Sequence, residues 1–179
     1  MNIDDLLTAL VYLVVFYLMF FIGKRVNDLL HRGYDLTYEL VHRDNPAIAL
    51  AVAGYYLGLV LAIGGAVAGP SHGLVNDLID LGIYGLLAIV LLNLSWLVCE
   101  KFLLHRFSTE DELIRDQNCG TGAVVFGVNV ASGVIVFGAV TGQGGNIWTA
   151  AVFWAVGQLI LLAAARSEEH TSELQSPNT

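Results

Sequence analysis

The chain alternates long apolar blocks with shorter polar segments. A helix of about 20 residues crosses the ~30 Å hydrocarbon core of a bilayer, so each block is long enough for one crossing. The blocks are continuously apolar, which argues against the alternating strands of a membrane barrel. The pattern predicts an all-α polytopic membrane protein with five transmembrane helices, at Leu6–Gly23, Ala47–Gly69, Leu81–Cys99, Gly120–Gly142 and Ile147–Ala165.

Composition supports a membrane protein. Hydrophobic residues make up 56% of the 179 residues and charged residues only 13%, whereas soluble domains average about 25% charged residues. These values exclude a soluble enzyme, a nucleic-acid-binding protein and a disulfide-stabilised scaffold. The lipid bilayer is therefore the expected surrounding, and nucleic acid is not an expected partner.

The basic residues indicate the orientation. Lys and Arg concentrate on the cytoplasmic side of membrane proteins, and here all 8 of them follow the first, third or fifth block. The N-terminus is therefore predicted outside and the C-terminus in the cytoplasm. Asp4 and Asp5 precede the first block and no small-residue cleavage site follows it, so we interpret this block as a retained anchor. The basic residues are Lys24, Arg25, Arg32, Arg43, Lys101, Arg106, Arg115 and Arg166.

Two parts of the chain resemble each other. Leu29–Gly54 and Leu103–Gly127 both begin with the sequence LLHR, and they align through a polar loop into an apolar block. The similarity predicts tandem two-span units at about 6–76 and 81–146 that share one orientation, with the fifth span opening a third unit. The aligned identical residues include Glu39 and Glu112, Asn45 and Asn118, and Gly54 and Gly127.

The two longer loops are expected to hold short amphipathic helices at the inner membrane surface. Leu36, Leu40 and Val41 recur at helical spacing in the first loop. In the second, Thr109 and Glu112 have the spacing of a capping box. Basic residues in these loops would contact anionic lipid head groups. A solvated hairpin in each loop is the alternative.

The last residues differ in character from the rest. Residues 167–179 are polar and aperiodic, and they hold Glu168, Glu169 and Glu173 among the 16 acidic residues. They resemble the translated read-through of a sequencing adapter. We therefore place the membrane domain at 1–166 and interpret 167–179 as a non-native tail, with a natural polar C-terminus as the alternative.

Polar residues next to the spans admit two interpretations. Asn45 and Asn118 stand directly before the second and fourth spans, where an asparagine side chain caps free backbone N–H groups, and Pro46 suits the first helical position. Alternatively, Asn45 and Asn118 with Glu39 and Glu112 line the inner mouth of a pore, where paired carboxylates gather a cation.

Polar residues within the spans are expected to join helices to one another, because polar groups at membrane depth usually face protein. None of the five spans holds a charged residue or histidine deep inside, which argues against a proton pump, an ion-coupled carrier and an intramembrane protease. The intramembrane polar residues are Asn93, Ser95, Asn129, Ser132 and Gln158.

Small residues recur about every four positions in the second and fourth spans. Such rows let two helix backbones approach closely. They predict helix-packing seams at Gly54, Gly58, Ala62 and Ala66 of the second span and at the equivalent Gly127, Ala131 and Ala139 of the fourth.

Motifs for catalysis or cofactor binding are missing from the sequence. It contains no HExxH, CxxC, phosphate-binding loop, GxSxG or dinucleotide fingerprint. We therefore predict no catalytic residues, no metal site and no cofactor, and we expect the protein not to be an enzyme. Cys99 and Cys119 are expected to be free thiols at the reducing cytoplasmic face.

The pattern Glu39 … Asp44-Asn45-x-Ala47 … Gly54-x-x-x-Gly58, with its echo in the second unit, resembles the YjfL-like bacterial inner-membrane proteins, a family known as domain of unknown function 350. The resemblance implies repeated two-span units and a bacterial plasma-membrane location. It implies no established activity. The second unit departs from the pattern, because Gln117 replaces the acidic residue and Gly120 replaces the alanine.

Two functions fit these features. The first is a helical scaffold or a subunit of an envelope complex, with further copies of itself or other envelope proteins as partners. The alternative is a small channel or transporter with a polar cytoplasmic vestibule.

Overall fold

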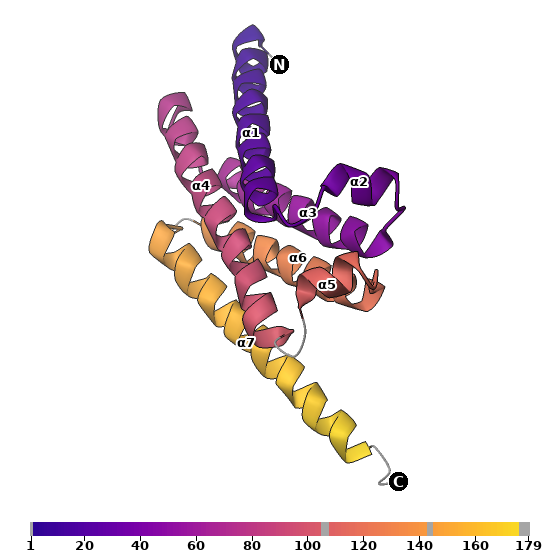
Figure 1. Ribbon diagram of the computed structural model, residues 1–179. Helices are drawn as coiled ribbons and strands as arrows, with labels where there is room; N and C mark the ends of the chain where they lie inside the picture. The colour runs from indigo at the N-terminus through magenta and orange to yellow at the C-terminus, as the bar shows by residue number, and fades with distance from the viewer. Residues whose placement is uncertain (1, 105–107, 143–144, 176–179) are drawn as a thin grey trace.

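Helices form nearly all of the described chain (Figure 1). The computed structural model describes residues 2–104, 108–142 and 145–175, with side chains described as far as Ala164. His105 and Arg106 of the second LLHR segment lie outside the described residues. The helices are α1 (Ile3–Leu30), α2 (Leu36–Val41), α3 (Pro46–Ala68), α4 (Leu74–Val98) with a π-helical turn η1 (Cys99–Leu103), α5 (Thr109–Ile114), α6 (Cys119–Thr141) and α7 (Ile147–Gln175).

The prediction of five membrane-crossing helices is confirmed. In the part of the chain that the structure describes, α1, α3, α4 with η1, α6 and α7 are long and apolar enough to span a bilayer. The chain is therefore a polytopic membrane protein. Three helices extend beyond the predicted limits: α1 ends at Leu30 and not at Gly23, α4 begins at Leu74 and not at Leu81, and α7 remains helical past residue 166. The earlier start of α4 has a physical reason, because Asp77 in its first turn interacts favourably with the helix dipole.

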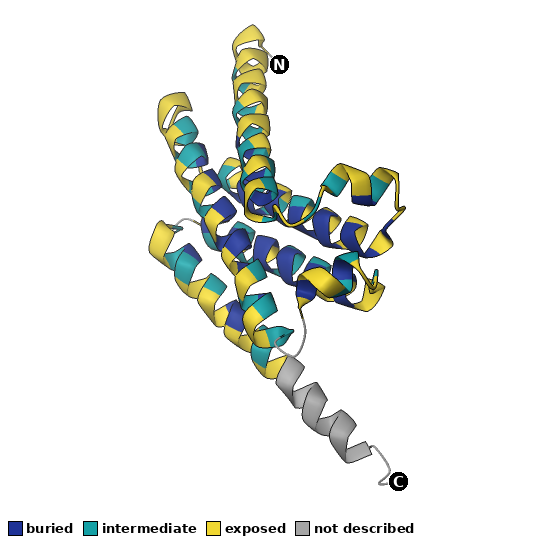
Figure 2. Ribbon diagram, viewed as in Figure 1, coloured by how far each residue is buried: buried dark blue, intermediate teal, exposed yellow. Residues whose placement is uncertain are grey.

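The centre of the molecule is a pair of helices, α3 and α6. They lie side by side, and both begin at the end of the molecule where α2 and α5 lie (Figure 1). Contact between the described helices is most extensive for this pair, while α4 packs against both of them and against α1 and α7. Buried residues concentrate on α3, α6 and the side of α4 that faces them (Figure 2).

Glycines allow the close approach of α3 and α6. A Cβ atom added at Gly122 would lie 2.6 Å from the carbonyl oxygen of Ala47, and one added at Gly133 would lie 2.6 Å from the Cα of Gly58. Both neighbours are backbone atoms, which cannot move aside without separating the helices. The two helices therefore depend on glycine at these positions.

The residues of the predicted seam lie in different settings on the two helices. Gly54, Gly58 and Ala62 are buried, and Ala66 is half-buried. Gly127 is exposed, and a Cβ added there would meet no atom of another helix within 4 Å; the α6 side of the contact includes Gly122, Asn129 and Gly133. Ala131 and Ala139 are half-buried at the margin. The two helices are parallel, and they contact each other through different faces. Gly127, which aligns with Gly54 in the repeat, therefore lies outside the contact.

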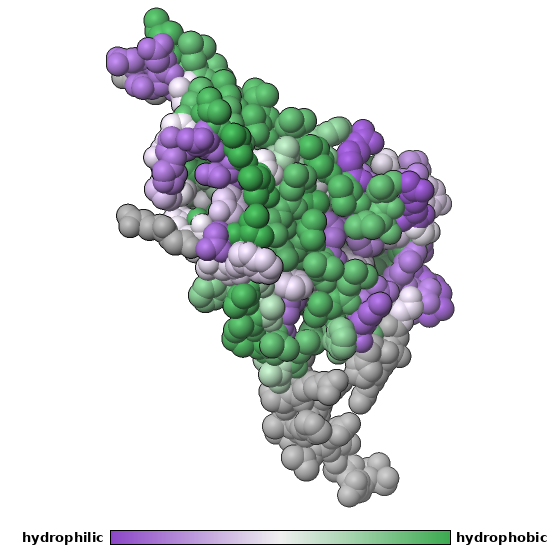
Figure 3. Space-filling view, turned by 90° about the vertical axis from the view of Figure 1, so that its left-hand side faces the viewer, coloured by the Kyte–Doolittle hydropathy of each residue, from purple (hydrophilic) through white to green (hydrophobic). Residues whose placement is uncertain are grey.

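Helix α1 lies at the periphery. Its only buried residues are Met19, Gly23 and Asn27, and most of its length is exposed (Figure 2). Its exposed residues are mainly large and apolar. Figure 3 shows a broad hydrophobic area over the middle of one face, with hydrophilic residues gathered at its margins. Such a surface suits contact with lipid chains.

Candidate functional site

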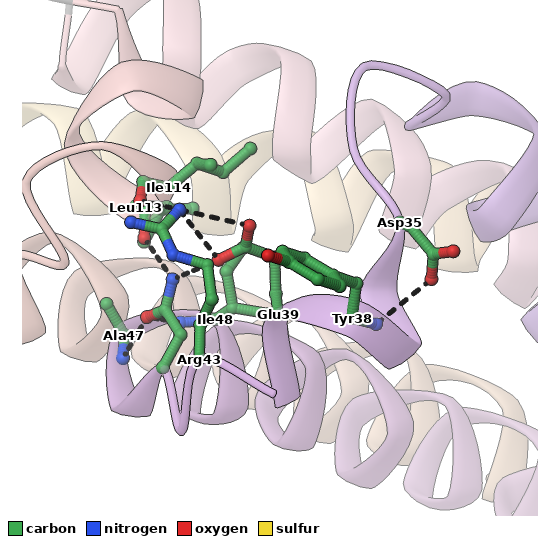
Figure 4. A network of polar contacts seen from close by, with 9 residues as sticks. Asp35, Tyr38, Glu39, Arg43, Ala47, Ile48, Leu113 and Ile114 are labelled. Atoms are coloured by element: carbon green, nitrogen blue, oxygen red, sulfur yellow. Dashed lines mark hydrogen bonds and ion pairs between the residues drawn. The ribbon is translucent and has the colours of Figure 1, made fainter. Parts of the chain in front are cut away.

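The loop that joins α2 to α3 holds a buried polar cluster, shown in Figure 4. Asn45 Nδ2 donates to Glu39 Oε2 at 2.9 Å, and Arg43 Nη1 donates to Glu39 Oε1 at 3.2 Å. Glu39 is 4% exposed and Asn45 is 1% exposed. A carboxylate in such a place requires partners, because an unpaired buried charge is strongly unfavourable. Arg43 and Asn45 are those partners.

Local backbone geometry places these side chains. The Asp35 side chain caps α2 by accepting from the Tyr38 N–H at 3.1 Å. After α2 the chain reverses at Asp44, whose φ of 47° lies in the left-handed region. The reversal lets the Asn45 N–H donate to the Glu39 carbonyl at 3.0 Å. Asn45 then lies at the N-cap of α3, where its Oδ1 accepts from the N–H groups of Ala47 and Ile48.

The same cluster joins the first loop to the second. Asn45 Nδ2 also donates to the Leu113 carbonyl at 2.9 Å, and Arg43 Nη1 donates to the Ile114 carbonyl at 3.1 Å. Both acceptors belong to the C-terminal end of α5. We call this arrangement the inner clasp: Glu39, Arg43 and Asn45 with the carbonyls of Leu113 and Ile114. It links segments far apart in the sequence at one end of the α3–α6 pair.

The second loop has similar geometry in a more open setting. Asn118 Nδ2 donates to Glu112 Oε2 at 2.7 Å, and the Asn118 N–H donates to the Glu112 carbonyl at 2.8 Å. Gln117 has a φ of 48°, close to that of Asp44. Asn118 caps α6 through the N–H groups of Gly120 and Thr121. Unlike Asn45, however, Asn118 is exposed.

The four candidates for an inner mouth thus form two separate pairs. Glu39 bonds to Asn45 and Glu112 bonds to Asn118, and the described contacts include none between the two pairs. The carboxylates are used to hold each loop against its own helix cap.

An ion pair lies on the surface of the second loop. Arg115 Nε donates to Asp116 Oδ1 at 2.9 Å, and this hydrogen bond lowers the pKa of Asp116 from its usual value. Both residues are exposed. Exposed pairs of this kind contribute little to stability. We therefore expect the inner clasp to contribute more to the free energy of unfolding than this ion pair does.

The predicted capping box at Thr109 is wrong. The N-cap of α5 is Ser108, whose Oγ accepts from the Asp111 N–H at 3.2 Å. Thr109 is buried, and its hydroxyl has no hydrogen-bond partner among the described residues. Ser108 has the extended backbone of a capping residue, with φ −74° and ψ 116°.

The polar residues of the spans connect helices. Ser95 on α4 bonds to Ser132 on α6 at 2.9 Å, and Gln158 Nε2 on α7 donates to Ser132 Oγ at 2.8 Å. Trp154 Nε1 donates to Ser95 Oγ at 2.7 Å. Ser95 and Ser132 are fully buried. This cluster joins α4, α6 and α7 within the membrane region.

The two intramembrane asparagines keep an unused acceptor. Asn93 Nδ2 donates to the hydroxyl of Tyr55, which in turn donates to the Gly23 carbonyl, so α1, α3 and α4 are connected. Asn129 Nδ2 donates to the Val125 carbonyl of its own helix. The Oδ1 atoms of Asn93 and Asn129 are buried and have no partner among the described residues.

Some contributors had weak sequence signals. Arg43 lies four residues after Glu39, the spacing of a helical ion pair, which identifies a local contact but not its bonds to α5. Tyr55 and Trp154 look like ordinary aromatic residues of a span, and nothing in the sequence marks their polar contacts.

Metal-binding groups do not cluster in the described ranges 2–104, 108–142 and 145–175. Cys99 is buried and Cys119 is exposed, and both are free thiols. Cys119 is the first residue of α6, so it marks the end of the molecule that carries the inner clasp.

Comparison with protein families gives a match over most of the chain. Residues 1–140 match the model of DUF350, a domain of unknown function. The chain belongs to the DUF350 family. No curated protein and no solved structure matches it. The DUF350 match includes the inner clasp, the α3–α6 pair and α4, whereas α7 follows it.

Proposed function

We propose that this DUF350 protein is a non-enzymatic membrane scaffold, or a subunit of an envelope assembly, in the bacterial plasma membrane. The observation that carries the proposal is the inner clasp. Its polar groups, of which Glu39 and Asn45 are buried and Arg43 is exposed, join two loops and leave the Glu39 carboxylate bonded on both sides. The Ser95, Ser132 and Gln158 cluster supports the same interpretation, since it uses intramembrane polar groups to hold helices together.

We also infer that the chain contains two copies of a span–loop–span unit. The matching backbone turns at Asp44 and Gln117 support the duplication, as do the equivalent bonds from Asn45 to Glu39 and from Asn118 to Glu112. These similarities lie in polar loops, where chance resemblance between apolar helices plays no part.

The orientation that we propose places the N-terminus outside and the inner clasp in the cytoplasm. All 8 Lys and Arg residues follow the predicted ends of the first, third and fifth spans, at Gly23, Cys99 and Ala165. Both loops of the clasp then lie on the same side, as the bonds between them require.

A small channel is the second candidate. The observation in its favour is the pair of unused amide oxygens, Asn93 Oδ1 and Asn129 Oδ1, on spans α4 and α6. Oxygens of this kind bind water or cations along permeation paths.

Flux measurements on liposomes that contain the full chain separate the two candidates. For a scaffold, release of potassium ions and of glycerol should equal release from protein-free liposomes. It should stay unchanged in the double variant Glu39→Gln with Glu112→Gln, and also in the surface control Glu110→Gln. Flux above the protein-free level that the double variant abolishes and the control preserves would overturn the scaffold proposal.

A further inference from the structure

A cavity of about 420 Å³ lies between the C-terminal halves of α1 and α4, beneath the loop that carries α5. Its size falls within the range of small-molecule sites. Its walls are largely aliphatic, and they include Val26, Leu30, Ile89, Val90, Leu94 and Leu97. An alkyl chain suits such walls, and the volume leaves room for one chain.

Asn93 is one of the polar residues that line this cavity, together with His31, Tyr34, Glu100 and Glu110. Asn93 is 8% exposed, and its Nδ2 is bonded to the Tyr55 hydroxyl and to the Ile89 carbonyl. Its Oδ1 accepts nothing from the residues that the structure describes. A buried acceptor without a donor is unfavourable by about 1–3 kcal/mol. An occupant of the cavity should therefore carry a hydroxyl or an N–H group as well as a chain.

A second cavity, of about 270 Å³, shares His31 and Tyr34 with the first and is lined by charges of both signs. Lys24 and Asp28 lie about one turn apart on α1, and Asp35 lies at the N-cap of α2. The structure gives no ion pair for Lys24 or Asp28 within its described ranges. Asp35 uses only Oδ1 to cap α2. Such a lining suits a head group that carries a phosphate and an ammonium together.

The geometry of His31 connects the two cavities. Its Nδ1 is bonded to the Asn27 carbonyl at 2.9 Å, so Nδ1 carries the proton and Nε2 remains for a ligand. The His31 ring packs edge-on against Trp96 at 4.3 Å between centroids. Trp96 and Asn93 share a face of α4 and lie about one helical turn of ~5 Å apart. A ligand hydroxyl bonded to Asn93 would therefore lie about one helical turn from Trp96 and from the His31 ring, which lines both cavities.

We propose that the two cavities together bind one molecule of a single-chain phospholipid with a phosphoethanolamine head. The acyl chain occupies the apolar cavity, and the free glycerol hydroxyl donates to Asn93 Oδ1. The phosphate accepts from Lys24 Nζ, and the primary ammonium donates to the carboxylates of Asp28 and Asp35. A single-chain lipid fits better than a two-chain lipid, because esterification of the second position removes the hydroxyl.

Native mass spectrometry of the full-length protein in dodecyl maltoside tests this site. One oleoyl lysophosphatidylethanolamine per protein is expected to bind. Lysophosphatidylcholine should bind at least about tenfold more weakly, because its quaternary ammonium has no N–H for Asp28 and Asp35. Dioleoyl phosphatidylethanolamine should also bind more weakly, because it has no free hydroxyl for Asn93. Equal binding of all three lipids would overturn the proposal.

Substitutions assign the preferences to residues. Asn93→Leu should remove the preference for the single-chain lipid, and Asp28→Asn should remove the preference for ethanolamine over choline. The controls Asn76→Leu and Asp80→Asn, on the opposite end of α4, should change neither. Unchanged preferences in Asn93→Leu would contradict the proposal.

Photolabelling covers the case in which Asn93→Leu does not fold. A lysophosphatidylethanolamine with a diazirine in its chain should label wild-type peptides from α1 and α4 only. Labelling spread evenly over all five spans would overturn the site.

Discussion

Gly133→Ala should destabilise the protein by about 3 kcal/mol. The added Cβ would lie 2.6 Å from the Cα of Gly58 and closer still to its carbonyl oxygen. These are backbone atoms of α3, so relief requires the two central helices to separate along their whole contact. Overpacking in a tight interior costs about 1–3 kcal/mol, and a clash with backbone lies at the upper end. The measurement is unfolding of the purified protein in mixed detergent micelles, followed by far-UV circular dichroism.

Gly127→Ala is the matched control on the same helix. A Cβ there meets no atom within 4 Å, and alanine has a helix propensity about 1 kcal/mol better than glycine. This variant should be as stable as the wild type or up to ~1 kcal/mol more stable. If Gly127→Ala destabilised the protein as much as Gly133→Ala, the α3–α6 contact described above would be wrong.

Asn45→Ala should also lower stability by about 3 kcal/mol. Loss of the α3 cap contributes about 1 kcal/mol. The substitution also removes the donor that Glu39 and the Leu113 carbonyl share, both in a buried setting. Buried groups left without partners add about 1–3 kcal/mol each, more for a charge. The same unfolding measurement gives the value.

Asn118→Ala is the corresponding substitution in the second loop. Asn118 caps α6 and bonds to Glu112, but it is exposed, so water can replace the lost contacts. Its effect should stay near 1 kcal/mol, the usual cost of a lost cap. Equal effects of Asn45→Ala and Asn118→Ala would show that the inner clasp adds nothing to a simple helix cap.

The sequence was sufficient to predict the five membrane helices. An apolar run of this length has few alternatives in a bilayer, because each backbone polar group needs an internal partner. The first seven residues of α4 were missed because the spans were predicted from hydrophobicity alone. Residues 74–80 mix apolar and acidic residues, so they do not form a continuous apolar run. The helix nevertheless begins at Leu74, because Asp77 in its first turn interacts favourably with the helix dipole.

The packing faces could not be predicted from the repeat. Aligned residues share a position in each unit, and this led to the expectation that Gly54 and Gly127 both belong to packing seams. In the structure α3 presents the face of Gly54 and Gly58, whereas α6 presents that of Gly122 and Gly133. The face by which a helix contacts its neighbour depends on how the two repeat units are arranged in space. The spacing of small residues along the sequence does not specify that arrangement.

The polar residues of the candidate site were predictable by type and position but not by partner. Asn45 and Asn118 look identical in sequence, yet one is buried in the inner clasp and the other is exposed. The difference arises because α5 covers the first loop. Long-range contacts of this kind, like those of Trp154 with Ser95, follow from tertiary packing.

The central claim is that the loops of α2 and α5 lie on the same side of the membrane, joined by the inner clasp. Accessibility of single cysteines to a membrane-impermeant thiol reagent tests it in right-side-out and inverted vesicles. Native Cys119 and a cysteine at Thr37, each as the only exposed thiol, should react in inverted vesicles only. A cysteine at Ser71, with Cys119 replaced by alanine, should react in right-side-out vesicles only. Reaction of the Thr37 and Cys119 sites from opposite sides would contradict both the five-span arrangement and the inner clasp.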